Sequence, residues 1–266
     1  MRVFISADIE GICFTDEWKE TRKDDPEYPK ACAQMTAEVR AACEGAIEAG
    51  ADYILVNDAH GHGTNIDVSQ LPECVEVIRG WSGNPLAMAD GVQEGHFDAA
   101  MFIGYHCAAG RQGSPLSHTN SLKPAKVRIN GEIGSEFLIF SYAAAMYGVP
   151  TVFLSGDRCL CDDSADLHPM LKTVAVKEGW GGRVKCLHPK VACDRIREGV
   201  KEALGQDLGM AKIELPEWFR LEITYKEPVD AVRNSYYPGF VLENDNTIHT
   251  ETESYMEILT AIEFLT

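Results

Sequence analysis

The sequence has few basic residues and no long apolar run, and both absences exclude classes of partner. Only 24 lysines and arginines stand against 41 aspartates and glutamates, which gives a formal charge of -17. A chain with this charge repels phosphate backbones and anionic lipid, so we expect no nucleic-acid and no membrane partner. The longest nearly apolar stretch, residues 137–147, is shorter than the roughly 20 residues that a membrane span needs.

Several common motifs are also missing. No P-loop, H-E-x-x-H, G-x-S-x-G or G-x-G-x-x-G sequence occurs, which removes the usual support for nucleotide binding and serine hydrolysis. The N-terminus lacks a basic region followed by an apolar core, so we expect no signal peptide. The nine cysteines are scattered without a C-x-x-C pair, which favours free thiols and a cytoplasmic location. Cys159 and Cys161 lie beside two aspartates, but we do not favour a metal site there.

What is present is the pattern of a layered α/β protein. Short apolar runs at 3–7, 53–56, 99–103 and 151–154 each end in a polar turn that contains glycine, and helical stretches separate them. Apolar periodicity predicts helices over about 35–47, 136–147, 189–204 and 254–265, and a further strand over 219–225. The predicted fold class is therefore α/β, with a mostly parallel sheet and helices on both of its faces.

The length of 266 residues allows one large domain or two modest ones. The pattern is less regular after residue 178. We expect a metal-binding catalytic α/β domain over 1–178. Residues 179–266 then form either a smaller C-terminal lobe or a continuation of the same domain.

Acids and imidazoles follow three of the predicted strands. Asp8 and Glu10 come after the first strand, Asp58 and His60 after the second, and His106 after the third. The carboxyl ends of parallel strands meet at one edge of a sheet, where ligands bind. Carboxylates gathered there repel one another unless a cation is present, and mixed nitrogen and oxygen ligands suit zinc or another divalent first-row metal. We expect His62, two residues beyond His60, at the rim.

Further candidates lie downstream. His118 follows His106 by 12 residues, and a histidine in such a loop either transfers protons near a bound substrate or is an ordinary surface residue. Glu132 and Glu136 flank a turn that begins the predicted helix at 136–147. Either glutamate could serve the site, and either could instead stabilise the start of the helix.

Taken in order, these motifs resemble the D-aminopeptidase family. The matching segments are Ser-Ala-Asp-Ile-Glu-Gly at 6–11, Val-Asn-Asp-Ala-His at 56–60, Gly-Tyr-His at 104–106, Ser-His at 117–118 and the turn at Glu136. Five motifs in matching order and nearly matching spacing make the resemblance specific. It extends from the first residue to about 177.

The resemblance implies a function and a set of site residues. Members of the family carry a binuclear zinc centre and cleave small peptides with an N-terminal D-residue, such as D-Ala-D-Ala. The family's metal ligands fall on Asp8, Glu10, His60 and His106, with a final glutamate at Glu136, and its active-site histidine falls on His118. Glu132 also sits in a Gly-Glu pair like the family's. A gapless count back from Val149-Pro150 favours Glu136, where Ser135 stands in place of the usual glycine.

The family also implies a mechanism and an assembly. Two zinc ions about 3.5–4 Å apart would share a water and lower its pKa, so that a metal-bridged hydroxide attacks the scissile carbonyl. No further cofactor is implied. The family forms ring-shaped homo-oligomers, and a decamer is one such ring.

Two other functions remain open at this point. The same residues could form a metal-dependent amidase or esterase that acts on another small substrate. They could also form a non-catalytic protein that binds metal and peptide in connection with transport.

Overall fold

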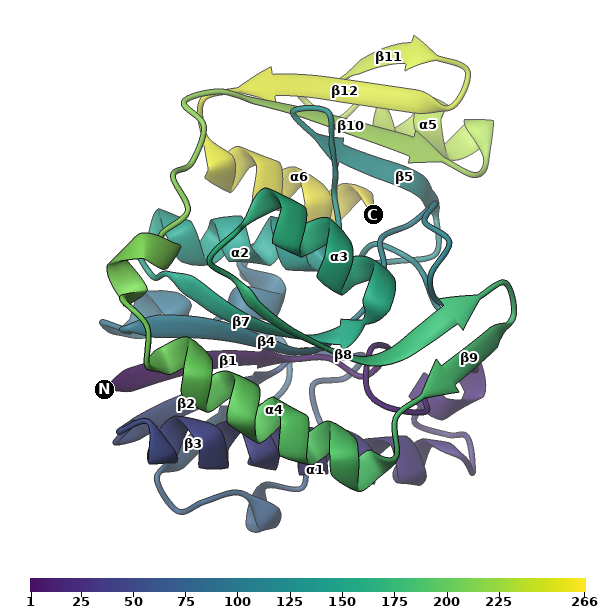
Figure 1. The fold of residues 1–266 in the computed structure, drawn as a ribbon. Coiled ribbons are helices and arrows are strands. Elements are labelled where there is room, and N and C mark those ends of the chain that lie inside the picture. The colour runs from purple at the N-terminus through teal and green to yellow at the C-terminus, as the bar shows by residue number, and fades with distance from the viewer.

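The computed structural model describes residues 1–266 and contains two sheets (Figure 1). The larger sheet has seven strands in the order β3-β2-β1-β4-β7-β8-β9, and every neighbouring pair is parallel except β8 and β9. Its strands are β1 (Arg2–Ala7), β2 (Tyr53–Asp58), β3 (Val75–Ile78), β4 (Ala99–Tyr105), β7 (Thr151–Asp157), β8 (Lys172–Trp180) and β9 (Arg183–Cys186).

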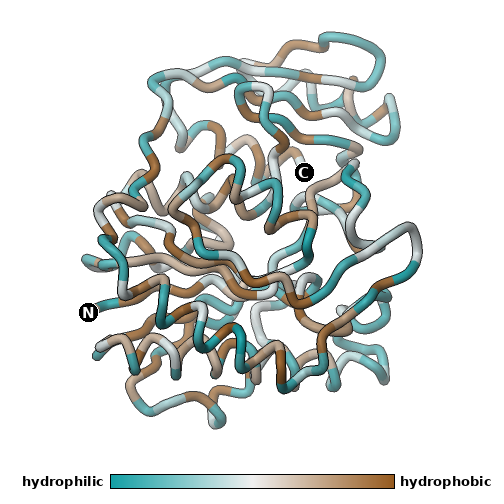
Figure 2. The backbone as a smooth tube through the Cα atoms, in the orientation of Figure 1, coloured by the Kyte–Doolittle hydropathy of each residue, from teal (hydrophilic) through white to brown (hydrophobic).

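Helices cover both faces of this sheet. On one face α1 (Tyr28–Glu48) and α4 (Pro189–Leu204) pack against each other and share an apolar core with β1 and β4. On the other face lie α2 (Glu136–Met146) and α3 (Arg158–Leu167). In Figure 2 the path of α4 alternates between hydrophobic and hydrophilic residues, as expected of a helix with one buried side. The predicted fold class is confirmed.

The second sheet is antiparallel and has five strands in the order β11-β12-β10-β5-β6. Its strands are β5 (Pro124–Ile129), β6 (Glu132–Ile133), β10 (Phe219–Tyr225), β11 (Val241–Asn244) and β12 (Thr247–Thr252), and α5 (Pro228–Asn234) and α6 (Tyr255–Leu265) pack against it.

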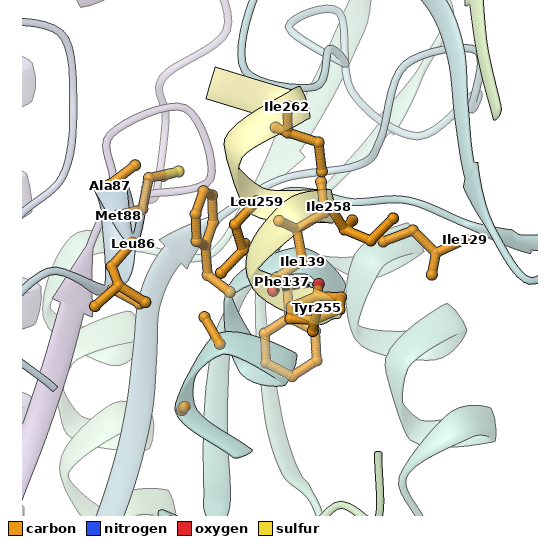
Figure 3. Close-up of a cluster of buried hydrophobic side chains, with 14 of the residues drawn as sticks. Leu86, Ala87, Met88, Ile129, Phe137, Ile139, Tyr255, Ile258, Leu259 and Ile262 are labelled. Carbon is orange, nitrogen blue, oxygen red and sulfur yellow. Dashed lines mark hydrogen bonds between the residues drawn. The ribbon is translucent and has the colours of Figure 1, made fainter. Parts of the chain in front are cut away.

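A continuous apolar core joins the second sheet to the first. Figure 3 shows Tyr255, Ile258 and Ile262 of α6 among side chains from β5, α2 and the segment 86–88. Short 3-10 helices complete the chain: η1 (Trp18–Thr21), η2 (Val68–Gln70), η3 (Ala87–Ala89), η4 (Val92–Glu94) and η5 (Leu208–Ala211). None of the helices is both long and apolar enough to cross a membrane.

The expected helices at 136–147, 189–204 and 254–265 coincide with α2, α4 and α6 within one residue at each end. The division expected at residue 178 stays a prediction. In the structure β8 runs through that position, and β5 and β6 join strands from the end of the chain.

Candidate metal centre

The carboxyl ends of three neighbouring strands of the larger sheet bring the expected site residues together. Ala7 at the end of β1 pairs with Asp58 of β2 on one side and with Ile103 of β4 on the other. The hydrogen bonding continues past β1, because Asp8 N–H donates to Ile103 O at 2.8 Å and Ala59 N–H donates to Ala7 O at 2.8 Å. In the sheet β1 is followed by β2 on one side, whereas β4 is followed by β7 on the other side. The strand order therefore reverses between β1 and β4, which is where ligands bind in sheets of this kind.

Four of the expected ligands converge around Asp8. His60 Nδ1 lies 3.4 Å from Asp8 Oδ1 and 2.9 Å from Glu10 Oε2. His106 Nε2 lies 3.4 Å from Asp8 Oδ2 and 3.1 Å from Glu136 Oε2. The Asp8 carboxylate therefore lies between two imidazoles, one accompanied by Glu10 and the other by Glu136.

These separations suit ligands of a shared ion. Two donor atoms about 2.0–2.1 Å from one tetrahedral zinc lie roughly 3.3 Å apart. Asp8 Oδ2, Glu10 Oε2 and His106 Nε2 are fully buried, and none of them has a hydrogen-bond partner. Buried polar atoms without partners are costly unless something else satisfies them, so this donor set fits a bound cation.

Each imidazole is oriented by a backbone carbonyl. His60 Nε2 lies 2.8 Å from Thr21 O, and His106 Nδ1 lies 2.9 Å from Cys107 O. Because a carbonyl only accepts, each of these nitrogens carries the proton in the neutral ring, which leaves Nδ1 of His60 and Nε2 of His106 with a lone pair that can ligate a metal. Those are the two atoms that face the carboxylates.

The electrostatics show how strongly these carboxylates favour positive charge. Burial lowers the pKa of His106, but Glu136 and Asp8 outweigh it and raise the pKa to about 10. Burial and the neighbouring Glu10 together raise the pKa of Asp8 to about 7. For Glu10, burial opposes ionisation, but the nearby His60 holds its pKa well below the usual range.

The structure shows which of the two candidate glutamates, Glu132 or Glu136, lies at the cluster. Glu136 is the first residue of α2 and is 3% exposed, and Ser135 caps the helix by accepting a hydrogen bond from Leu138 N–H at 3.1 Å. Glu132 is exposed on β6 and points away from the cluster into a different pocket. Only Glu136 is brought to the expected ligands.

His118 stacks on His106 with ring centroids 4.3 Å apart and an interplanar angle of 6°. Its Nδ1 lies 2.8 Å from Leu116 O, so Nε2 is the free nitrogen, and this atom lies 3.7 Å from Glu136 Oε1. Burial lowers the pKa of His118, and the neighbouring His106 lowers it further. His118 is thus at the cluster, with its free nitrogen directed toward it.

Two candidates from the strand ends are not brought to the cluster. Asp58 is buried, but its Oδ2 accepts hydrogen bonds from Asn65 N–H at 2.6 Å and Ile66 N–H at 2.9 Å, and its Oδ1 accepts from Asn65 Nδ2 at 2.6 Å, so it holds the loop after β2 in place. His62 is exposed and does not line the pocket.

Two of the nine cysteines form a separate group with an aspartate, and Cys161 is not part of it. Cys159, Cys107 and Asp157 have donor atoms within 4.8 Å of one another. Asp157, however, caps α3, accepting from Leu160 N–H at 2.8 Å and from Cys107 N–H at 2.7 Å. Its two oxygens already stabilise the local fold.

Lys177 is a buried residue beside the site that no sequence motif indicated. It is 3% exposed, and its ammonium donates to the backbone carbonyls of Glu10 and Thr15. Burial lowers its pKa, which the nearby acids Asp157 and Glu10 partly oppose. Its position directly after the apolar residues 174–176 of β8 was the available signal, since a lysine that continues a buried run needs a buried partner.

A pocket of about 360 Å³ opens over the cluster. Its wall includes Trp81, Met88, Asp90, Asn120 and Glu263 in addition to the metal-site residues, and no lysine or arginine lines it. The volume is in the range of about 300–1,000 Å³ that is typical of small-ligand sites. Buried acids and imidazoles at the base of such a pocket are characteristic of metal-dependent hydrolases.

Comparison with known proteins agrees with this class. The family model described as D-aminopeptidase matches residues 1–264. The chain is 28% identical to a D-aminopeptidase of Bacillus subtilis (strain 168) over 254 residues, which cover 93% of this chain and 89% of that protein. The solved structure of the Zn-dependent D-aminopeptidase DppA from Bacillus subtilis, a self-compartmentalizing protease, aligns with a TM-score of 0.91 and 25% identity, over 98% of this chain and 95% of that one.

The chain belongs to the D-aminopeptidase family. It is therefore a hydrolase of the aminopeptidase class, and the resemblance inferred from the sequence motifs is confirmed. The family match extends through the second sheet, well beyond residue 177 where the motif resemblance became faint.

Proposed function

We propose that this protein is a zinc-dependent aminopeptidase that hydrolyses small peptides with an N-terminal D-residue, of the D-Ala-D-Ala type. The observation that carries the proposal is the convergence of two imidazoles and three carboxylates at 2.9–3.4 Å with partnerless buried donor atoms. The zinc dependence of DppA from Bacillus subtilis supports the choice of metal.

Two zinc ions per chain fit this donor set. His60 and Glu10 would hold one ion, His106 and Glu136 the other, and Asp8 would bridge them, since its two oxygens face different imidazoles. Bound zinc polarises a carbonyl and lowers the pKa of water, so that hydroxide forms near neutral pH, and two ions can share that hydroxide.

His118 would move the proton in this reaction. Its Nδ1 proton is fixed on Leu116 O, and burial favours the neutral ring, so Nε2 can accept a proton and release it to the leaving amine. Trp18 packs edge-on against the imidazole with ring centroids 5.3 Å apart, which adds a packing contact to the hydrogen bond that orients the ring.

The walls of the pocket support a substrate with a free amino terminus. Asp90 and Glu263 add negative charge above the metal site, and no basic side chain on the wall offsets it. A peptide ammonium is attracted into such a field, whereas an anionic substrate is repelled.

We also propose a homo-oligomer, because DppA is described as self-compartmentalizing. The specific form proposed, a ring-shaped decamer, rests on the family resemblance alone. Enclosure within a ring would limit substrates to short peptides. The proposed location is the cytoplasm, which the nine free cysteines support.

The test is elemental analysis of the purified protein together with release of D-alanine from D-Ala-D-Ala. We expect about two zinc ions per chain, hydrolysis of D-Ala-D-Ala, and little hydrolysis of L-Ala-L-Ala. Glu136→Gln should lower the zinc content and abolish activity, while the matched control Glu132→Gln, on exposed β6, should leave both unchanged.

Other results would assign the protein differently. Preference for L-peptides, amides or esters would indicate a metal-dependent amidase or esterase. Tight binding of zinc and peptide without turnover would indicate a non-catalytic binding protein.

A further inference from the structure

Asn120 has an unusual backbone at the wall of the pocket. It follows His118 by two residues and has a left-handed φ of 58°. Ser121 N–H donates to Thr119 O at 2.6 Å, so Asn120 is the central residue of a three-residue turn. Turns of this kind with positive φ are rare and strained, and strain of this type is concentrated at functional sites.

Contacts on both sides hold this turn in place. The Thr119 hydroxyl donates to Gly134 O at 3.0 Å and accepts from Ala109 N–H at 3.1 Å. Asn120 N–H donates to Glu136 Oε1 at 2.6 Å. The backbone of Asn120 is therefore fixed relative to the proposed metal ligand Glu136.

The side chain of Asn120 is the only asparagine side chain in the protein without a hydrogen bond. The other seven asparagine side chains, at positions 57, 65, 84, 130, 234, 244 and 246, each bond to a backbone or side-chain group. Asn120 Oδ1 is buried without a partner, whereas Nδ2 is not among the buried atoms, and the residue lines the pocket. A carboxamide held on a rigid turn with an accessible, unused donor is suited to bind a ligand acceptor.

We propose that Asn120 is a substrate-positioning residue whose Nδ2 donates a hydrogen bond to a carbonyl oxygen of the bound peptide. The inference rests on the proposed aminopeptidase function and adds a substrate contact to it. A carbonyl is favoured over the substrate ammonium because the exposed atom is the donor and the acceptor Oδ1 is covered. Since the same residue holds Glu136 through its backbone, the contact sets the peptide at a fixed distance from the metal site.

The test compares three variants with wild type in steady-state hydrolysis of D-Ala-D-Ala and in zinc content. Asn120→Gly removes the side chain but keeps the left-handed turn and the N–H bond to Glu136, since glycine adopts this φ freely. Asn120→Asp keeps the shape and replaces the donor with an acceptor. Asn130→Gly is the control for a purely structural loss, because Asn130 also has a positive φ of 52° but lies outside the pocket, and its side chain bonds to Trp218 O and Arg220 N–H.

We expect Asn120→Gly to raise KM about five- to tenfold, the value of one neutral hydrogen bond, with kcat and zinc content near wild type. Asn120→Asp should raise KM further, and Asn130→Gly should leave KM unchanged. Wild-type KM in Asn120→Gly would overturn the inference. So would a loss of zinc in that variant, which would assign the side chain to the metal site instead.

The outcome also separates this inference from the function on which it rests. If wild-type protein hydrolyses D-peptides and Asn120→Gly does so with the same KM, only the substrate contact is wrong. If wild-type protein hydrolyses no peptide, the proposed function is wrong and the contact is wrong with it.

Discussion

Gly11→Ala tests whether close contact between two backbone segments builds the metal site. A Cβ at Gly11 would lie 1.8 Å from Tyr105 O and 2.6 Å from Gly104 C, and an ordinary contact needs at least 3.4 Å. The segment after β1 or the end of β4 must therefore move by about 1.6 Å, the difference between 3.4 and 1.8 Å. Gly11 does not have a positive φ, so alanine adds no backbone strain of its own.

Either movement displaces metal ligands. Gly11 follows Glu10 directly, and Tyr105 directly precedes His106. Metal sites tolerate errors of about 0.2 Å in ligand distance, so a shift of about 1.6 Å is far too large. We expect Gly11→Ala to lose at least one zinc per chain and more than about 100-fold in kcat/KM, with about 1–3 kcal/mol of destabilisation from overpacking.

The assay is zinc content after dialysis, together with kcat/KM and thermal unfolding. Gly182→Ala is the control, because a Cβ there meets nothing within 4 Å and the position does not have a positive φ. Wild-type zinc content and activity in Gly11→Ala would refute the argument that this backbone contact sets the ligand positions.

Two further predictions concern a proton carrier and a buried acid. His118→Ala should lower kcat by about 100-fold or more with zinc retained. The control His62→Ala, on an exposed loop, should leave kcat unchanged. Near-normal turnover in His118→Ala would remove His118 from the mechanism. Burial raises the pKa of Glu38 from 4.5 to about 7, so the native state binds its proton more tightly than the unfolded state. Between pH 4.5 and 7 Glu38 should therefore contribute a fall of about 3 kcal/mol in the free energy of unfolding as pH rises, and Glu38→Gln should remove this contribution. Urea unfolding in EDTA at pH 5 and pH 8 measures the difference, and equal pH dependence in both proteins would contradict it.

The sequence predicted the buried strands β1, β2, β4 and β7, and also β10 at 219–225, whose buried and half-buried residues alternate. It missed other strands with more exposed residues. β1, β4 and β7 are continuous apolar runs, because helices cover both sides of the larger sheet. β5, by contrast, reads Pro-Ala-Lys-Val-Arg-Ile, and its partner β10 lies about 90 residues further along the chain. No local pattern reports a pairing between such distant and partly polar segments.

The strand ends likewise predicted which residues gather, but not which of them are free to bind. Asp58 is the last residue of β2 and His60 follows it by two residues, so both are equally good candidates by position. The structure assigns Asp58 to the N–H groups of Asn65 and Ile66, and this depends on the path of a loop that residue types alone do not specify. The sequence did not indicate that Lys177 is buried for a related reason, since its partners are backbone carbonyls more than 160 residues away along the chain.

The positions of two further site residues, Glu136 and Asn120, depend on the second sheet. Asp8, His60 and His106 follow three adjacent parallel strands, so the larger sheet alone brings them together. Glu136 instead begins α2 directly after β6, the edge strand of the antiparallel sheet, and Asn120 lies on the segment that leads into β5. Because β5 pairs with β10 and β10 with β12, the positions of Glu136 and Asn120 depend on strands from the end of the chain. The pocket therefore requires both sheets, and the C-terminal strands support the site although they contribute none of the proposed metal ligands.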